Sequence, residues 1–564
     1  MIRTLPALSA LLLLSACGQA IAPASPELAA VNGWCFSGGT IYTADDAQPT
    51  ADAVAVIGNK ITYVGADEGD WCPEQAVPYD LNGYTLYPGL TDAHAHLIGI
   101  GKREMELDLT SAKSVLGLQD LVRAVVITTP VGETVFGDGW IETHWPEGRF
   151  PTRQDLDAVS TDHPIILQRA DGHAAVANSL ALSMSKIDGS TEAPFGGAIN
   201  LDTEGNPTGM LIDNAQRLVF GLMPAMDAET RSRAFKLGSD VYASRGWTNI
   251  HSMSVMHSNV DMINQMANDG DISIRVYNSL GLPESGPSDK VAAMAGGLSG
   301  DAPHVTTRAI KLYADGALGS RGAALLLPYS DDLNNSGLMT LERDRAIPIF
   351  EAALRNGIQV NTHAIGDKGN QETLNWYEEA FNNVPKSEWA VQEPRWRIEH
   401  SQILDPSDIS RFKSLGVIPS MQPSHAIGDL HFAVDRLSTD RLEGAYAWRA
   451  LIDSGVIVAG GSDAPVEVGD PRIELHAAIQ RTDLDGYSNE NWGLDQRVAP
   501  QEALKMFTLW PAHAAFQENE LGSIEVGKLA DFSVFDKDML DPAVEPMDAN
   551  PVMTMVDGNV IWSR

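Results

Sequence analysis

Eight short apolar runs between residues 84 and 463, most of them separated by helical patterns, constrain the fold of this chain most strongly. Continuous apolar strands alternating with helices are typical of a parallel sheet covered on both faces. Eight such units predict an α/β fold, a closed (β/α)₈ TIM barrel. A doubly wound open sheet is the alternative, but no glycine-rich nucleotide turn follows the first run. The runs are YTLYPGLTDAH, GWTNIHSM, ISIRVYNS, RAIKLYAD, GIQVNTHA, RWRIEHS, GVIPSMQ and GVIVAGGSD.

The barrel is predicted to span residues 88–515, and the gap of about 150 residues between its first two strands is far longer than a normal loop. We therefore predict a folded insertion over the barrel mouth, at about 105–245. Short alternating strands at 33–87 and at 516–564 predict a small β-sandwich domain completed by both termini.

The first residues, MIRTLPALSALLLLSACGQ, read as an export signal. The apolar stretch is about a dozen residues long, shorter than the ~20 that a membrane span needs. Its ending, LSAC, resembles a bacterial lipobox, which predicts a signal over 1–17, a lipid on Cys17 and a tether over 18–32. Gly18 resembles the outer-membrane default of this sorting system. We therefore expect an exported, lipid-anchored envelope protein; an ordinary signal peptide is the alternative.

Two further cysteines, Cys35 and Cys72, follow the signal segment. An oxidising compartment permits a disulfide between them, and we favour the bridge over two buried free thiols.

The charge balance limits the partners. Lys and Arg total 39 against 75 Asp and Glu, a net charge of −36. Such an acidic surface repels phosphate backbones and argues against nucleic-acid binding. We expect a small-molecule substrate and contact with a membrane through the lipid alone; the sequence leaves the oligomeric state open.

Polar groups gather where the apolar runs end. His94 and His96 close the first run, Lys311 lies within the fourth, and His363, His400 and Asp463 lie at the ends of the fifth, sixth and eighth. Taken singly, each has an ordinary role as a hydrogen-bonded, core or capping residue. Parallel strands bring these ends to one face of a barrel, where so many buried polar groups need a shared partner. Imidazole and carboxylate predict a divalent metal, with Zn²⁺ the best fit.

The stretches LYPGLTDAHAHL, IKLYADGALGSR, NTHAIGD, IEHSQ, MQPSHAIGD, GSDAPVE and LGSIEVGKLADFSVFD resemble the amidohydrolase superfamily. The resemblance points to its amidohydrolase-3, YtcJ-like branch, which includes N-substituted formamide deformylases. It runs from about residue 33 to the end of the sequence. It implies a TIM barrel, a β-sandwich and metal-dependent hydrolysis.

The resemblance also implies roles for these residues. His94 and His96, with Asp463, match the ligands of the more buried metal, and His363 and His400 match those of a second. Lys311 matches a lysine that such enzymes carbamylate to bridge two metals. Whether the site holds one metal or two remains open.

The resemblance further implies that metal-activated hydroxide attacks a polarised carbonyl. Asp463 is expected to serve as general base and then as general acid to the leaving nitrogen. The expected reaction is hydrolysis of an amide-type carbon–nitrogen bond, in an N-substituted formamide or another N-acyl compound. The alternatives are a lipid-anchored binding protein without catalysis and a metal-dependent isomerase or lyase.

Three further residues are candidates for substrate contacts. Arg321 follows the fourth run and offers a clamp for a carboxylate or carbonyl, although an ordinary surface role fits it equally. His425 follows the seventh run, and loop packing is its alternative. His173 lies in the insertion and is expected to face the pocket from above. His251, at the end of the second run, is expected to support the site without touching substrate.

Overall fold

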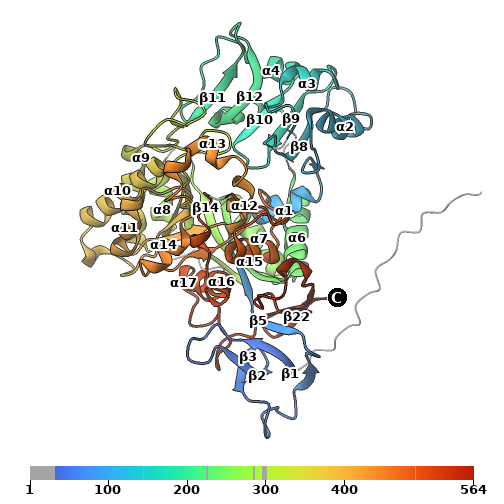
Figure 1. Cartoon of the computed structure of the whole chain (residues 1–564), viewed down its shortest axis with the longest axis vertical. Coiled ribbons are helices and arrows are strands. Elements are labelled where there is room, and N and C mark those ends of the chain that lie inside the picture. Colours follow the sequence, from blue (N-terminus) through green and yellow to red (C-terminus); the bar gives the residue numbers. More distant parts are fainter. Residues whose placement is uncertain (1–31, 144, 224–225, 284–285, 295–301, 490) are drawn as a thin grey trace, which may run out of the picture.

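The computed structural model describes residues 32–143, 145–223, 226–283, 286–294, 302–489 and 491–564. A parallel barrel forms the middle of the molecule, with a terminal sheet at one end and the insertion at the other (Figure 1). The signal segment and Cys17 lie outside the described residues. Within the described part, no helix combines the length and apolarity that crossing a bilayer requires.

The barrel confirms the predicted α/β class. Its strands pair in parallel in the order β19-β18-β17-β16-β15-β14-β13-β6. Each predicted run contributes one strand to the barrel, as expected for apolar segments that are buried on both faces of a parallel sheet. The strands are β6 (Leu90–Ala95), β13 (Trp247–Val255), β14 (Arg275–Gly281), β15 (Val305–Tyr313), β16 (Gln359–Ala364), β17 (Arg397–His400), β18 (Ile418–Met421) and β19 (Ala459–Gly460).

Helices follow the barrel strands and cover the outside of the barrel. Apolar side chains of strands and helices form one continuous core. The helices are α1 (Leu97–Arg103), α6 (Ala228–Arg245), α7 (Val260–Asn268), α8 (Pro287–Ala293), α9 (Arg343–Asn356), α10 (Asp367–Asn383), α11 (Ile409–Leu415), α12 (Pro423–Asp429), α13 (Ala433–Leu437), α14 (Trp448–Asp453), α15 (Pro471–Gln480), α16 (Pro500–Met506) and α17 (Leu509–Ala514).

The first apolar run is divided between two sheets, whereas the sequence suggested one strand. The run breaks at Gly89, between β5 (Thr85–Pro88) in the terminal sheet and β6 in the barrel. The backbone passes close to its neighbours here, since a Cβ on Gly89 would lie 2.4 Å from Thr248 Oγ1. A glycine therefore allows the chain to leave one sheet and enter the other.

The terminal sheet draws on both ends of the chain, as predicted. Strand β5 pairs in parallel with β1 and antiparallel with β20, so the N-terminal and C-terminal segments meet in one mixed sheet. Its path is β22-β21-β20-β5-β1-β2-β3, and β4 pairs with β1 off this path. The other strands are β1 (Gly33–Tyr42), β2 (Thr50–Ile57), β3 (Lys60–Gly65), β4 (Val77–Asp80), β20 (Phe532–Phe535), β21 (Pro551–Val556) and β22 (Asn559–Ser563).

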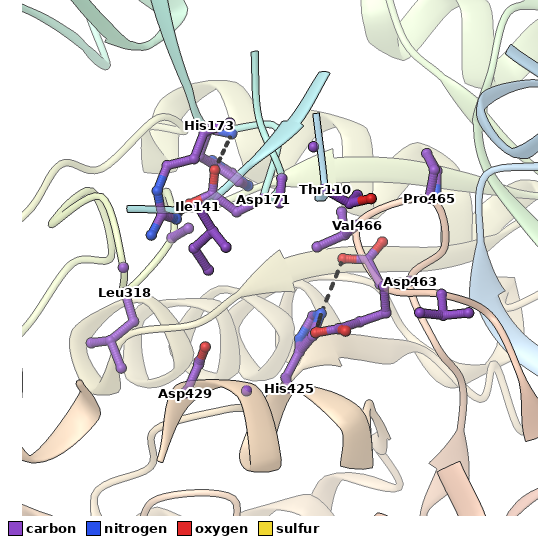
Figure 2. A pocket seen from close by; sticks show the side chains of 18 of the residues that line it. Thr110, Ile141, Asp171, His173, Leu318, His425, Asp429, Asp463, Pro465 and Val466 are labelled. Atoms are coloured by element: carbon purple, nitrogen blue, oxygen red, sulfur yellow. Dashed lines mark hydrogen bonds and ion pairs between the residues drawn. The ribbon is translucent and has the colours of Figure 1, made fainter. Parts of the chain in front are cut away.

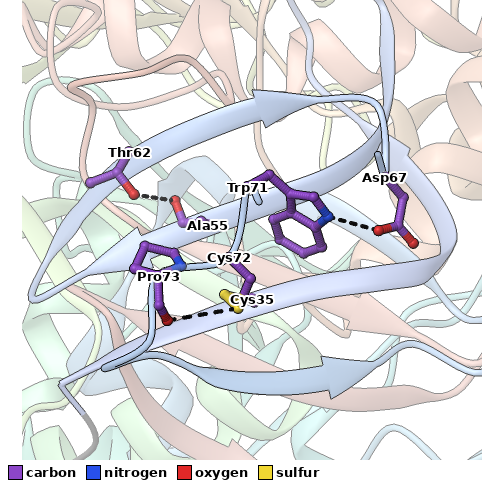
Figure 3. The surroundings of a disulfide bond; sticks show 7 residues. All are labelled: Cys35, Ala55, Thr62, Asp67, Trp71, Cys72 and Pro73. Atoms are coloured by element: carbon purple, nitrogen blue, oxygen red, sulfur yellow. Dashed lines mark hydrogen bonds between the residues drawn. A yellow bond between two sulfur atoms is a disulfide. The ribbon is translucent and has the colours of Figure 1, made fainter. Parts of the chain in front are cut away.

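The disulfide favoured from the sequence is present in this sheet. Cys35 in β1 is bonded to Cys72 in the loop before β4 (Figure 3). The bond ties the 66–76 loop, including Trp71, to the terminal sheet.

The insertion between β6 and β13 folds around its own six-stranded sheet, in the order β11-β12-β10-β9-β8-β7, with its own apolar clusters. We call this segment the roof, because its residues line the cavity opposite the barrel strand ends. Its elements are β7 (Leu107–Asp108), α2 (Val115–Val126), β8 (Val135–Trp140), α3 (Arg153–Asp157), β9 (Ile165–Arg169), β10 (Ala174–Ala177), α4 (Ser179–Met184), β11 (Gly197–Leu201), β12 (Pro207–Asp213) and α5 (Arg217–Phe220).

Candidate metal centre

The two histidines of the first barrel strand meet Asp463, which follows the last strand. The Nε2 atoms of His94 and His96 lie 3.4 and 3.1 Å from Asp463 Oδ1. All three residues offer ligand atoms within 4.8 Å of one another. His94 is buried, whereas the His96 side chain is 26% exposed and borders the cavity. Side chains at the ends of the first and the last barrel strands, 367 residues apart at His96 and Asp463, thus converge on one point.

Two of the converging residues have an unusual backbone conformation. His400 ends β17 with φ +74° and Asp463 has φ +61°, in the left-handed region that few non-glycine residues adopt. A regular strand would send Glu399 and His400 to opposite faces. Instead, Glu399 contacts His94, and the His400 ring lies 4.8 Å from that of His94. Such conformations concentrate at functional sites.

A second group of possible ligands contains His400, His425 and Asp463, again with ligand atoms within 4.8 Å. His425 extends from α12 with its Nε2 atom 3.8 Å from Asp463 Oδ2 (Figure 2). That Nε2 atom is buried without a hydrogen-bond partner among the described residues. The sequence had suggested His425 for substrate contact, whereas the geometry places it among the possible ligands.

His363, the other residue assigned to the second metal, lies beside His400 with a ring separation of 4.5 Å. Its Nε2 atom is 3.3 Å from the Gly316 carbonyl and 3.5 Å from Asp315 Oδ1. His363 belongs to neither three-residue group among the described residues. The geometry therefore offers His425 and His363 as alternative neighbours of His400.

Lys311 is buried at the centre of the cluster, with Nζ 3.4 Å from His94 Nε2. Burial lowers the pKa of Lys311 to about 8, although Glu399 and Asp463 oppose this. The fraction of neutral amine near neutral pH is therefore larger than for an exposed lysine, which favours the expected carbamylation.

The charge states of the cluster suit a divalent cation. Burial, with neighbouring histidines, holds the pKa values of His363 and His400 well below the usual range. Burial alone would raise the pKa of Asp463, but His94, His96 and His400 hold it well below its ordinary value. Neutral imidazoles and an ionised carboxylate form the donor set that zinc-type ions prefer. The residues present therefore fit a metal.

A buried ion pair beneath the cluster was not identified from the sequence. Glu399 Oε2 lies 2.5 Å from His94 Nδ1, and Arg397 Nε lies 2.8 Å from Glu399 Oε1. Arg397 also contacts Nδ1 of His251 at 2.9 Å, so His251 supports the site without lining the cavity. The sequence signal for this pair was the presence of two charged residues, Arg397 and Glu399, at alternate positions of a strand predicted to be buried.

His173 faces the site from the roof, as predicted. Its Nδ1 lies 2.6 Å from Asp213 Oδ1, and its ring is 5.1 Å from that of His363. Burial alone would lower the pKa of His173, but Asp213, with Asp171, raises it to about 9. Figure 2 shows His173 and Asp171 across the cavity from His425 and Asp463. The roof thus presents a cationic imidazole to the site at neutral pH.

Glycines after β15 allow the roof to approach the barrel. A Cβ on Gly316 or Gly322 would lie 2.5 or 2.4 Å from Asp213 Oδ2, and one on Gly319 would lie 2.9 Å from Arg169 Nη1. Arg169 in turn pairs with Glu142 and Asp171. The segment GALGSRG therefore serves as a docking surface for the roof.

Arg321, in the same segment, points elsewhere. Its guanidinium forms hydrogen bonds of 3.1 and 2.8 Å to Asp331, and it lies outside the residues that line the two cavities at the site. Its suggested role as a substrate clamp has no support in this geometry, because a carboxylate of the chain already occupies its donors.

Two adjoining cavities reach the cluster. One, of about 540 Å³, runs between the roof and α12 and includes Asp429 and Glu467. The other, of about 980 Å³, includes Phe195, Phe220 and Tyr313. Both are lined by His173, His363, His400 and Asp463. A bound molecule can therefore extend to both sides of the cluster.

Comparison with known proteins finds relatives of this chain over nearly its whole length. The model of the Amidohydrolase family matches residues 79–562. YtcJ of Bacillus subtilis (strain 168) is 29% identical over 94% of this chain and 99% of its own. An N-substituted formamide deformylase of Arthrobacter pascens is 28% identical, covering 93% and 97%. The crystal structure of an uncharacterized metal-dependent hydrolase from Pyrococcus horikoshii OT3 has a TM-score of 0.71 at 26% identity, covering 91% and 99%.

Proposed function

This chain belongs to the amidohydrolase family, and on that premise we propose that it hydrolyses the carbon–nitrogen bond of an amide. N-substituted formamides and other N-acyl compounds are the substrate classes we assign. The similarity to a formamide deformylase over nearly the whole chain supports the first class. The cavities on both sides of the cluster provide room for a substituent larger than a formyl group.

The observation that carries the proposal is the convergence of His94, His96 and Asp463 within 4.8 Å. We assign these residues to one divalent metal, best matched by Zn²⁺. His400, with His363 or His425, would hold a second metal, and Lys311, once carbamylated, would supply a further oxygen donor to the site. A bound metal of this kind supplies Lewis acidity and lowers the pKa of water from 15.7 to about 7.

The chain's own residues handle the proton. Asp463 is ionised, and its Oδ2 faces the side where His425 borders the cavity. We propose that Asp463 accepts the proton of the attacking water and delivers it to the leaving nitrogen. An amide nitrogen departs poorly without protonation, and acid–base help of this kind contributes about 10²–10⁴-fold.

From the roof, we assign His173 to the oxygen of the substrate. Asp213 fixes the His173 ring through Nδ1, which leaves Nε2 facing the cavity. The cationic form donates a hydrogen bond there, and such a donor stabilises the negative charge that develops on a carbonyl oxygen during attack.

We also propose that the protein is exported and lipid-anchored through Cys17, in the outer membrane of a bacterial envelope. The signal-like segment and the lipobox-like ending support this. The Cys35–Cys72 disulfide agrees with an oxidising compartment.

The test of the proposed function is Asp463→Asn, assayed on a panel of N-substituted formamides and N-acyl amines with metal content measured in parallel. We expect the variant to fold, retain metal and lose about 10²–10⁴-fold in kcat. Asp470→Asn is the matched control, because Asp470 lies in the same loop and caps α15, a role that asparagine also fills. Near-normal turnover by Asp463→Asn would contradict the assignment.

A further inference from the structure

Beneath the candidate metal centre, one histidine has a charged partner. Glu399 Oε2 lies 2.5 Å from His94 Nδ1, and both side chains are at most 1% exposed. We propose that Glu399, held by Arg397, is the positioning residue that fixes the ring and tautomer of His94 for metal binding. This inference rests on the metal site of the proposed function.

The first step is the direction of the hydrogen bond. An ionised carboxylate only accepts hydrogen bonds, so Nδ1 of His94 carries the hydrogen that Glu399 receives. In the neutral ring, Nε2 then carries the lone pair. That atom lies 3.4 Å from Asp463 Oδ1 and 3.4 Å from Lys311 Nζ, at the centre of the cluster. Glu399 thereby directs the lone pair of His94 toward the proposed metal position.

The second step is the restraint on Glu399 itself. Arg397 contacts both of its carboxylate oxygens, at 2.8 and 3.0 Å. Nη2, which also faces Glu399 Oε2, lies 2.5 Å from Ala93 O in β6 and 2.7 Å from Ser420 Oγ in β18, and Nη1 lies 2.9 Å from His251 Nδ1 in β13. The guanidinium is therefore held by three other barrel strands, which leaves Glu399 little freedom to rotate.

The third step is energetic. The interior of such a barrel is usually filled by Val, Ile and Leu. Here Arg397 and Glu399 are both 0% exposed. Desolvation of two charges commonly offsets their attraction, so a buried pair is a poor means of gaining stability. A role in orienting a ligand explains why the two charges lie under the histidines.

We call the residues at the barrel strand ends, opposite the roof, the floor of the cavity. Two other histidines of this floor, His96 and His400, differ from His94 in their partners at Nδ1. His96 Nδ1 lies 3.2 Å from the Met253 carbonyl, and His400 Nδ1 lies 2.8 Å from Gln422 Oε1. These partners are neutral. A carboxylate partner makes an imidazole a stronger metal donor, and loss of such a partner typically weakens metal binding 10–100-fold. His94 is therefore assigned as the principal imidazole donor of the floor.

The experiment measures Zn²⁺ affinity of the full chain by competition with a chromophoric chelator, independently of any substrate. Glu399→Ala is expected to raise the Kd for Zn²⁺ about 10–100-fold. Glu399→Gln should lose less, because its amide oxygen still accepts from Nδ1. In metal-free protein, ¹⁵N NMR of the histidine side chains should show Nδ1–H for His94 in the wild type and a tautomer mixture in Glu399→Ala.

Tyr377→Phe is the matched control. It removes buried hydrogen bonds to Thr362 and to the Arg397 carbonyl without touching Glu399, and it should leave the Kd unchanged. If Glu399→Ala does not fold, the Kd and NMR spectrum of Glu399→Gln decide. Wild-type affinity with wild-type ¹⁵N shifts in the Glu399 variants would overturn this inference alone. A wild-type chain that binds no Zn²⁺ would overturn the proposed function as well.

Discussion

The floor and the roof of the cavity combine the same three residue types, a histidine, a carboxylate and a buried arginine, in different ways. In the floor, His94 and Arg397 share one carboxylate, Glu399. In the roof the partners are separate. His173 has Asp213, while Arg169 has Glu142 and Asp171.

This difference shows that the role of a histidine depends on whether its carboxylate partner is also paired with an arginine. Glu399 is paired with Arg397, so it orients the His94 ring while the arginine offsets much of its negative charge. Asp213 Oδ1 lies 2.6 Å from the His173 ring, and its charge acts on His173, whose pKa rises to about 9 despite burial. The floor is thus suited to hold a cation, and the roof is suited to present one to a substrate.

The largest effect is expected from breaking the shared pair. Arg397→Met leaves the fully buried Glu399 without its guanidinium, which should destabilise the protein by about 3–5 kcal/mol. Arg169→Met is the matched change in the roof. There, the side chains of Glu142 and Asp171 are 8% and 17% exposed, so water reaches both abandoned carboxylates more easily than it reaches Glu399, and the loss should be smaller, about 1–3 kcal/mol. The shift in urea unfolding midpoint measures both, and equal shifts would remove the distinction between floor and roof.

A smaller effect is expected from the pH dependence of the roof. The folded-state pKa of His173, about 9, lies above its unfolded value of about 6.5. Its contribution to stability is therefore fully present below pH 6.5 and is lost as the pH rises through 9. In metal-free protein, the unfolding midpoints of wild type and His173→Gln should differ most near pH 6 and converge above pH 9. A difference that stays constant over this range would contradict the assigned charge.

The smallest effect is expected at Arg321, beside the roof contact. Asp331 keeps a second partner, Arg436, when Arg321 is replaced, and both members of the Arg321 pair are about one quarter exposed. Arg321→Ala should change the stability by less than about 1 kcal/mol. The KM for carboxylate-bearing amides should remain at its wild-type value. A several-fold rise in that KM would restore Arg321 as a substrate clamp.

The barrel could be predicted because buried parallel strands are continuous apolar runs, and chain topology then brings the strand ends together. That reasoning located His94, His96, His400 and Asp463 without a structure. It missed Glu399, because regular alternation places Glu399 and His400 on opposite faces. The φ of +74° at His400, which brings both to the site, has no sequence signal for a histidine.

The roof was predictable as an insertion but not in its contacts. Asp213 reaches His173 through the order of the strands within the roof, which depends on packing. The sequence suggested Arg321 as the functional residue of GALGSRG, whereas the glycines of this segment are the residues in close contact with Asp213 and Arg169. A glycine at every third position was the available signal for close approach of another backbone or side chain.

The pairing of β5 with β20 also has a consequence for the timing of biosynthesis. About 440 residues separate Pro88 from Phe532. At about 5–20 residues per second, a ribosome needs roughly 20–90 seconds to produce that stretch. During this interval the edge of β5 has no C-terminal partner, and unpaired edges are templates for aggregation. Completion of the terminal sheet therefore cannot precede the synthesis of β20, and until then the edge of β5 lacks this partner.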